Sequence, residues 1–231
     1  MDYQQDLGQV SAYETYSVGD KINFAGSDWY VIKDSTGDED YVTVMKETIL
    51  THNELGNYAI TKDGIKQDAM GFYWSSTCHH SVIYGNDTYT SSDSSGCAGH
   101  NDYSDSKVKE FLEGIYINTL ETSNLKEIDG YKIRVITNDD LVYNLGWSAT
   151  NNYATMPDNA QVPNWVYRNF GNDREKGVYG YWTMIPDSYQ SKNLMNIYDG
   201  NTQYIGLYSY NVSSHCFGVR PVINLLKSSI E

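Results

Sequence analysis

Long apolar runs and excess positive charge are both missing from this 231-residue sequence. Only 40% of the residues are hydrophobic, and the mean hydropathy of −0.56 leaves nothing to span a bilayer. We therefore exclude a membrane channel or transporter. Lysine and arginine number 16 against 30 acidic residues, which gives a net charge of −14. Because such a surface repels phosphate backbones, we expect no nucleic-acid partner.

Catalytic motifs are absent as well. The sequence has no GxSxG nucleophile elbow, no HExxH zinc motif and no phosphate-binding loop. The pair Asp139-Asp140 stands at the start of a predicted helix, where capping and the helix dipole account for it. None of the five histidines has a partner at metal-ligand spacing: His52, His79, His80, His100 and His215. We therefore predict that the protein is not an enzyme and has no metal site.

Cysteine is scarce, with three residues and no CxxC pair. Cys78 and Cys97 bracket the segment 79–96, which has almost no regular pattern. A disulfide between them would stabilise the fold by on the order of 3 kcal/mol, because it restricts the unfolded chain. We predict this disulfide on the condition that the protein is exported. The alternative is three reduced thiols, with Cys216 packed as a small apolar side chain beside Phe217.

Tyrosine, in contrast, is abundant, with 22 residues. It combines a large, stiff contact area with a polar tip, which suits half-buried strand positions and recognition surfaces. Seven of the 22 lie between residues 179 and 210, interleaved with Asn, Ser and Asp. This distribution indicates a displayed contact surface rather than core filling.

The first part of the chain predicts strands. Residues 21–24, 28–33 and 41–46 are rich in β-branched and aromatic residues and are separated by turn residues. We expect them to form an antiparallel meander. A further strand is predicted at 131–136, after the turn Asp129-Gly130.

Two amphipathic helices are predicted next. The first lies within 101–122, with Ser104 or Asp105 as its cap. Four apolar residues share one face of it: Val108, Phe111, Leu112 and Ile115. The second covers 138–145, where Thr137 and Asp140 have the spacing of a capping box and Gly146 supplies the stop. We also expect a short helix at 164–170.

The C-terminal third returns to β structure. Strands are predicted at 179–184, 194–198, 202–208 and 218–226. Alternate residues from Val219 to Leu225 are apolar, which predicts a half-buried last strand, and Pro221 restricts its stretch to a bulge or an unpaired edge. Arg220 lies on the other face, where we expect it to bond backbone carbonyls or a carboxylate near the core.

Long ordered loops are expected at 51–102 and 147–177. Because the sequence has no tandem repeat and no clean linker, we predict a tether at 1–16 and a single α+β domain at 17–231. The expected core residues are Trp29, Trp74, Phe111, Leu112, Ile133, Val135 and Trp182.

The last strand carries a resemblance to a known family. Gly218-Val219-Arg220-Pro221-Val222-Ile223-Asn224-Leu225 follows Tyr181-Trp182-Thr183-Met184, with Asp199-Gly200 between them. This order resembles the C-terminal half of a C-type-lectin-like domain, of the bacterial kind related to formylglycine-generating enzymes and to variable proteins of diversity-generating retroelements. The resemblance spans roughly residues 17–227. It implies a C-type-lectin-like fold with antiparallel sheets, two amphipathic helices and long ordered loops.

The same resemblance implies ligand binding. In diversified members of this superfamily, a retroelement mutates adenine-rich codons, and variable polar and tyrosine positions cluster on a ligand face just before the final strand. The segment 187–216 has this composition, and tyrosines among small polar residues are the chemistry of a paratope. The expected ligand contacts are Tyr189, Asn193, Asn196, Tyr198, Asn201, Tyr204, Tyr208, Tyr210, Asn211 and His215.

Two alternatives stay open: a non-diversified, pilin-associated surface adhesin and a carbohydrate-binding lectin-like module. Sugar binding would use calcium, as in animal C-type lectins, and this possibility overlaps the adhesin alternative. Pro163-Asn164 and Trp165 resemble the calcium and ligand motifs of animal C-type lectins, but Val162 replaces an acidic residue of that pattern. Asp34, Asp38 and Asp40 supply oxygens without forming a regular calcium loop. We otherwise expect no cofactor.

The N-terminus gives no signal peptide, because residues 1–6 are polar and acidic. We expect an extracellular or cell-surface protein of a bacterium, from which an anchor such as a pilin-type helix has been removed. Its partner would be a protein or glycan ligand on another cell or surface. Membrane contact would come only through that anchor.

Overall fold

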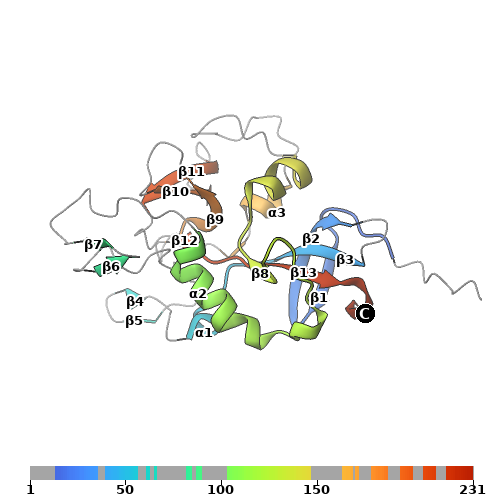
Figure 1. The fold of residues 1–231 in the computed structure, drawn as a ribbon. Helices are drawn as coiled ribbons and strands as arrows, with labels where there is room; N and C mark the ends of the chain where they lie inside the picture. The colour runs from blue at the N-terminus through green and yellow to red at the C-terminus, as the bar shows by residue number, and fades with distance from the viewer. Residues whose placement is uncertain are drawn as a thin grey trace, which may run out of the picture.

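The fold is a mixed α+β arrangement with two main sheets and a few short helices (Figure 1). No helix of the described residues has the length and apolar content needed to cross a membrane. The computed structural model describes residues 14–35, 40–56, 61–62, 65–66, 82–84, 87–89, 103–146, 163–168, 170–171, 178–186, 193–199, 205–211 and 217–230.

The larger sheet has five antiparallel strands in the order β1-β2-β3-β13-β8. The predicted meander forms its first half, and the Ala25-Gly26 turn has the two positive φ angles, 51° and 72°, that a tight hairpin requires. The last strand lies between the third strand and β8, so the two ends of the fold meet in one sheet. The five strands are β1 (Lys21–Phe24), β2 (Ser27–Asp34), β3 (Tyr41–Lys46), β8 (Ile133–Arg134) and β13 (Val222–Leu226).

The second sheet has the order β11-β10-β9-β12. Its strands are β9 (Gly180–Pro186), β10 (Asn193–Asp199), β11 (Ile205–Asn211) and β12 (Phe217–Gly218). The expectation of purely antiparallel sheets is wrong here, because β12 pairs with β9 in parallel. The strand predicted at 218–226 divides into β12 and β13, since the chain passes from one sheet to the other between them. Pro221 lies in this crossing, outside both strands, where its missing N–H breaks no ladder.

The first predicted amphipathic helix is α2 (Lys107–Gly114). Its cap is Ser106, whose hydroxyl accepts from the Lys109 amide at 3.0 Å, rather than Ser104 or Asp105. Val108, Phe111 and Leu112 are buried as predicted, but Ile115 is 43% exposed. The reason is that the helix ends at Gly114 and the chain turns away into a 3₁₀ segment, Tyr116–Thr119.

The other helices are short. The predicted helix 138–145 forms as a short helix over residues 138–144, most of which, Asp140–Asn144, is a wide π-helical turn rather than a regular α-helix. α1 (His52–Leu55) was not predicted, and α3 (Asn164–Tyr167) ends three residues early because Arg168 is extended. The expected loop 51–102 also contains two small ribbons. They are β4 (Thr61–Lys62) with β5 (Ile65–Lys66), and β6 (Val82–Tyr84) with β7 (Asp87–Tyr89). Three further 3₁₀ turns are Tyr103–Asp105, Thr122–Asn124 and Lys227–Ser229.

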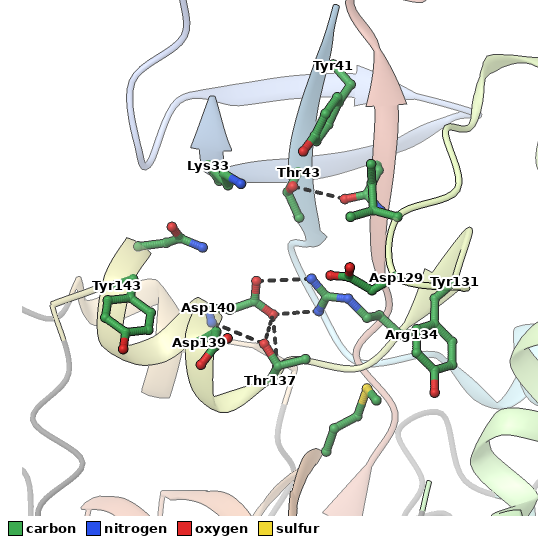
Figure 2. Close-up of a pocket in the computed structure, with 14 residues that line it drawn as sticks. Lys33, Tyr41, Thr43, Asp129, Tyr131, Arg134, Thr137, Asp139, Asp140 and Tyr143 are labelled. Carbon is green, nitrogen blue, oxygen red and sulfur yellow. Dashed lines mark hydrogen bonds and ion pairs between the residues drawn. The ribbon is translucent and has the colours of Figure 1, made fainter. Parts of the chain in front are cut away.

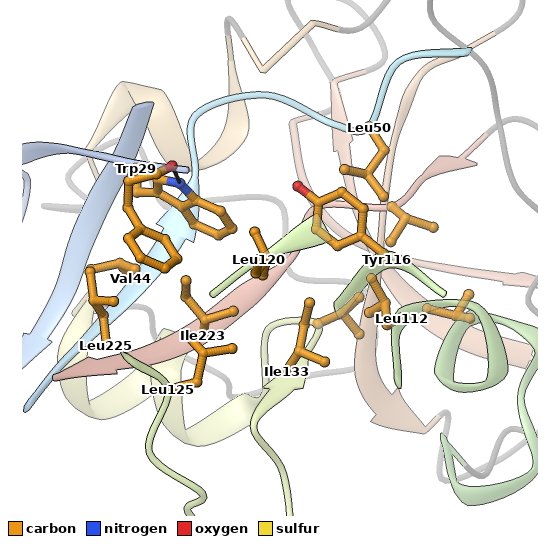
Figure 3. Packing of buried hydrophobic residues seen from close by; sticks show 14 of the residues in the cluster. Trp29, Val44, Leu50, Leu112, Tyr116, Leu120, Leu125, Ile133, Ile223 and Leu225 are labelled. Atoms are coloured by element: carbon orange, nitrogen blue, oxygen red, sulfur yellow. Dashed lines mark hydrogen bonds between the residues drawn. The ribbon is translucent and has the colours of Figure 1, made fainter. Parts of the chain in front are cut away.

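The core lies on both faces of the five-stranded sheet. One cluster joins the sheet to α2 through residues such as Trp29, Leu112 and Ile223 (Figure 3). The other joins the opposite face to α3 and β9. β13 is therefore covered on both sides, with Val222 only 1% exposed, and the prediction of a half-buried last strand is wrong. The expected core residues are confirmed, except that Trp74 lies outside the described residues.

Candidate functional site

The predicted ligand residues fall on and around the β10–β11 hairpin. Six of the ten are in the two strands: Asn193, Asn196, Tyr198, Tyr208, Tyr210 and Asn211. The other four lie outside the described residues: Tyr189, Asn201, Tyr204 and His215. The predicted Cys78–Cys97 disulfide and Cys216 lie outside them too.

The hairpin register divides these six positions between two faces. Asn196 is opposite Tyr208, position 194 is opposite Tyr210, and Tyr198 is opposite position 206. Residues that are opposite each other in an antiparallel pair lie on the same face. Positions 196, 198, 208 and 210 therefore share one face, whereas the pair Asn193 and Asn211 belongs to the other.

The base of the hairpin is fixed in the core. β10 pairs with β9, and Ile197, opposite Tyr181, is fully buried. On the other side of β9, Trp182 is also fully buried, and its ring centre lies 5.1 Å from that of Phe217 in β12. β9 is thus held from both faces, and β10 and β11 extend outward from it (Figure 1).

Arg220 has the structural role that the sequence predicts. It is fully buried, and its guanidinium donates to four backbone carbonyls: those of Lys46 at 2.7 Å, Glu47 at 2.8 Å, Trp165 at 2.8 Å and Val166 at 3.3 Å. It therefore ties the end of β3 to α3.

Tyr181 of β9 packs against the guanidinium of Arg220. Its ring centre lies 5.2 Å from the guanidinium carbon. Burial lowers the pKa of Arg220, while burial raises the pKa of Tyr181 to about 12. The Tyr181 hydroxyl therefore stays protonated at neutral pH and donates to the Val166 carbonyl at 2.5 Å.

A cavity of about 340 Å³ lies beside the five-stranded sheet, and the sequence did not reveal it. Figure 2 shows side chains from separate parts of the fold around it: Lys33, Tyr41 and Thr43 from the sheet, Asp140 from the π-helical turn, and Arg134 from β8. The described lining residues are Lys33, Tyr41, Thr43, Ile128, Asp129, Tyr131, Arg134, Thr137, Asp139, Asp140, Tyr143, Asn144, Met184 and Asn224. They come from segments far apart in the chain, so no local motif marks the site.

One wall of the cavity is held by charged and polar contacts. Arg134 forms a bidentate ion pair with Asp140, with Nη1–Oδ2 at 2.5 Å and Nη2–Oδ1 at 3.0 Å. The predicted capping box is confirmed: Asp140 Oδ2 accepts from the Thr137 amide at 2.9 Å, and Thr137 Oγ1 accepts from the Asp140 amide at 3.1 Å. These contacts fix the wall and neutralise its buried charges.

The rim of the cavity carries charges of both signs. Lys33, Asp129 and Asp139 are exposed, and in the described part of the chain none of them forms an ion pair. Asp129 and Gly130 both have positive φ, 53° and 82°, and Ile128 and Tyr131 exchange backbone hydrogen bonds of 3.0 and 2.9 Å across them. The predicted turn is thus confirmed, and it holds Asp129 at the rim.

The described residues contain no group of three or more His, Cys, Asp and Glu that could hold a metal ion. Asp34, one of the three carboxylates considered for calcium, instead pairs with Lys227 at 2.6 Å and accepts from the Tyr16 amide at 2.8 Å. The Trp165 ring stacks on Tyr30, with ring centres 4.4 Å apart. These residues therefore stabilise the fold, and Asp38 lies outside the described residues.

No protein-family model, no curated protein and no solved structure matches this chain.

Proposed function

We propose that this chain is an extracellular recognition domain of the C-type-lectin-like type, which binds a protein or glycan ligand through the segment 187–216. We further propose that it is a variable protein of a diversity-generating retroelement. The single observation that carries the proposal is the β10–β11 register, which aligns Asn196, Tyr198, Tyr208 and Tyr210 on one face. Tyrosine anchors next to small amides give large contact area with adaptable hydrogen bonding.

The connection of the hairpin supports the same proposal. β9 and β12 pair directly, with Gly180 opposite Phe217 and Tyr181 opposite Gly218. The chain therefore forms β10 and β11 on one side of β9 and then returns to the other side of β9 at β12. Side chains of β10 and β11 other than the buried Ile197 can change with little effect on the base of the sheet, because the remaining core contacts are made by β9 and β12. Such a scaffold suits a surface that varies.

If the β10–β11 hairpin is the ligand face, removing its tyrosine side chains should weaken ligand binding. The wild-type chain is expected to bind at least one member of a glycan array or of an array of purified cell-surface ectodomains. The double variant Tyr208→Ala/Tyr210→Ala should weaken that binding about tenfold or more, because aromatic anchors dominate such interfaces. The matched control is Ile115→Ala, which removes an exposed apolar side chain from the end of α2. Equal binding by the double variant and this control would contradict the hairpin as ligand face.

Diversification is tested separately, in the gene. Among sibling isolates, substitutions should concentrate at codons 196, 198, 208 and 210, while the buried Ile197 and Arg220 stay unchanged. A reverse transcriptase and a template repeat should lie nearby. A uniform 187–216 segment without a template repeat would leave the chain as a non-diversified surface adhesin, with the binding face unaffected.

A further inference from the structure

The floor of the cavity beside the five-stranded sheet is polar, although it lies on the central strands. Thr43 of β3 and Asn224 of β13 are register partners, each only 3% exposed. The Thr43 hydroxyl donates to Asn224 Oδ1 at 2.9 Å. Within the described chain the Asn224 amide nitrogen has no hydrogen-bond acceptor, and the residue lines the cavity. This nitrogen is not fully enclosed by protein, so it is able to donate to a molecule in the cavity.

The charges at the rim of the cavity restrict the kind of molecule that can bind there. Arg134 is occupied by Asp140, so the one free cation among the described lining residues is Lys33. Lys33 shares the rim with the carboxylates of Asp129 and Asp139, whose charge disfavours phosphate and other anions. Two carboxylates beside a lysine are also a poor site for a divalent cation. The cavity therefore favours a neutral ligand that carries both hydrogen-bond donors and hydrogen-bond acceptors.

Tyrosine rings supply the apolar part of the site. Tyr41, Tyr131 and Tyr143 all line the cavity. The Lys126 ammonium lies 4.5 Å from the Tyr41 ring centre, and Tyr131 packs edge-on against Tyr103, so these two rings are held in place. Tyr143 is 80% exposed on the π-helical turn, so its ring is accessible to a molecule in the cavity.

We propose that this cavity binds a neutral sugar residue at the end of a glycan. A sugar presents hydroxyl donors and acceptors at its edge and C–H groups on its faces, which match the polar floor, the mixed rim and the tyrosine rings. The volume of about 340 Å³ is in the range of small-molecule sites, ~300–1,000 Å³. The Arg134–Asp140 pair and the Asp129-Gly130 turn pre-organise its walls. None of the described lining residues belongs to 187–216, so this site is additional to the proposed hairpin face.

Saturation-transfer NMR on the full chain tests the proposal with four probes: the methyl glycosides of glucose, galactose, mannose and N-acetylglucosamine. At least one should receive saturation at its ring protons, with a Kd on the order of 1 mM. Tyr143→Ala and Asp129→Asn should each weaken that binding about tenfold. Both positions are exposed, and Asn tolerates the left-handed backbone of residue 129, so these variants are expected to fold.

Matched controls separate this site from the rest of the surface. Ile115→Ala and Glu121→Gln change exposed residues that do not line the cavity and should leave the saturation transfer unchanged. Tyr208→Ala/Tyr210→Ala should also leave it unchanged, so failure here and failure of the hairpin proposal are distinguishable. The sugar site is overturned if none of the four glycosides receives saturation from the wild-type chain. It is equally overturned if both cavity variants bind as the wild type does, or if the hairpin variant alone abolishes binding.

Discussion

Replacing Arg220 with methionine is expected to lower the free energy of unfolding by about 4 kcal/mol, enough to unfold a marginal domain. Methionine keeps an apolar stem but donates nothing to the carbonyls of Lys46, Glu47, Trp165 and Val166. Each buried acceptor left without a donor costs about 1–3 kcal/mol, whereas Val166 keeps the Tyr181 hydroxyl as its donor. The total stays below their sum, because methionine also removes the desolvation penalty of a fully buried cation.

Lysine should rescue only part of this loss. Its ammonium is a compact charge, whereas the guanidinium of Arg220 reaches β3 through Nε and Nη2 and α3 through Nη1. We expect Arg220→Lys to be destabilised by about 2–3 kcal/mol, since some of the four carbonyls stay unpaired. Arg220 stabilises the fold by joining β3 to α3, so a positive charge alone does not restore the lost stability.

Denaturant unfolding followed by tryptophan fluorescence measures both variants. The matched control is Arg168→Met, because Arg168 is only partly buried and its guanidinium carbon lies 5.9 Å from the Tyr167 ring centre. Loss of that contact should cost less than about 1 kcal/mol. If Arg220→Met were no less stable than Arg168→Met, the four carbonyls would have other partners and Arg220 would not hold β3 to α3.

Local sequence patterns predicted the features of the fold that are set by residues close together in the chain. The β-branched and aromatic segments of residues 21–46, separated by turn residues, predicted the meander, and the Thr137–Asp140 spacing predicted a capping box that the structure contains. The role of Arg220 followed because a lone arginine in an apolar last strand needs backbone acceptors. Each of these depends on a rule that spans only a few residues.

Features that depend on tertiary packing were not predicted. The parallel pairing of β12 arises where the chain crosses between the sheets. Ile115 fits the helical period of α2, but the helix ends one residue before it, so the periodicity alone was misleading. The cavity brings Lys33, Asp129 and Asn224 together from segments that are far apart in the sequence, and no spacing rule connects them. The candidate hairpin face was recognisable from composition, whereas its division into two faces required the register.

Gly180→Ala is expected to have the second large effect, because the β9–β10 pairing depends on the absence of a side chain at this position. A Cβ on residue 180 would lie 1.9 Å from the Ile197 carbonyl oxygen and 3.0 Å from its carbon. Both are backbone atoms of β10, so no rotamer change relieves the clash. A third contact, at 3.1 Å to Phe217 Cδ1, blocks movement toward β12.

The strands β9 and β10 must therefore separate, which breaks the register that pairs Tyr198 with Gly180 and Asn196 with Trp182 and releases the hairpin from the sheet base. We expect a loss of about 3 kcal/mol in the free energy of unfolding, together with loss of hairpin-dependent ligand binding.

The matched control is Gly114→Ala at the end of α2, where a Cβ meets nothing within 4 Å and alanine favours the helix by about 0.5–1 kcal/mol. Denaturant unfolding and amide exchange of residues 193–199 measure the difference. Because β9 contributes only Met184 to the described lining of the sugar cavity, methyl glycoside binding should persist wherever Gly180→Ala still folds. If Gly180→Ala matched the stability and exchange of Gly114→Ala, β9 and β10 would tolerate separation and the hairpin could not be a rigid display surface.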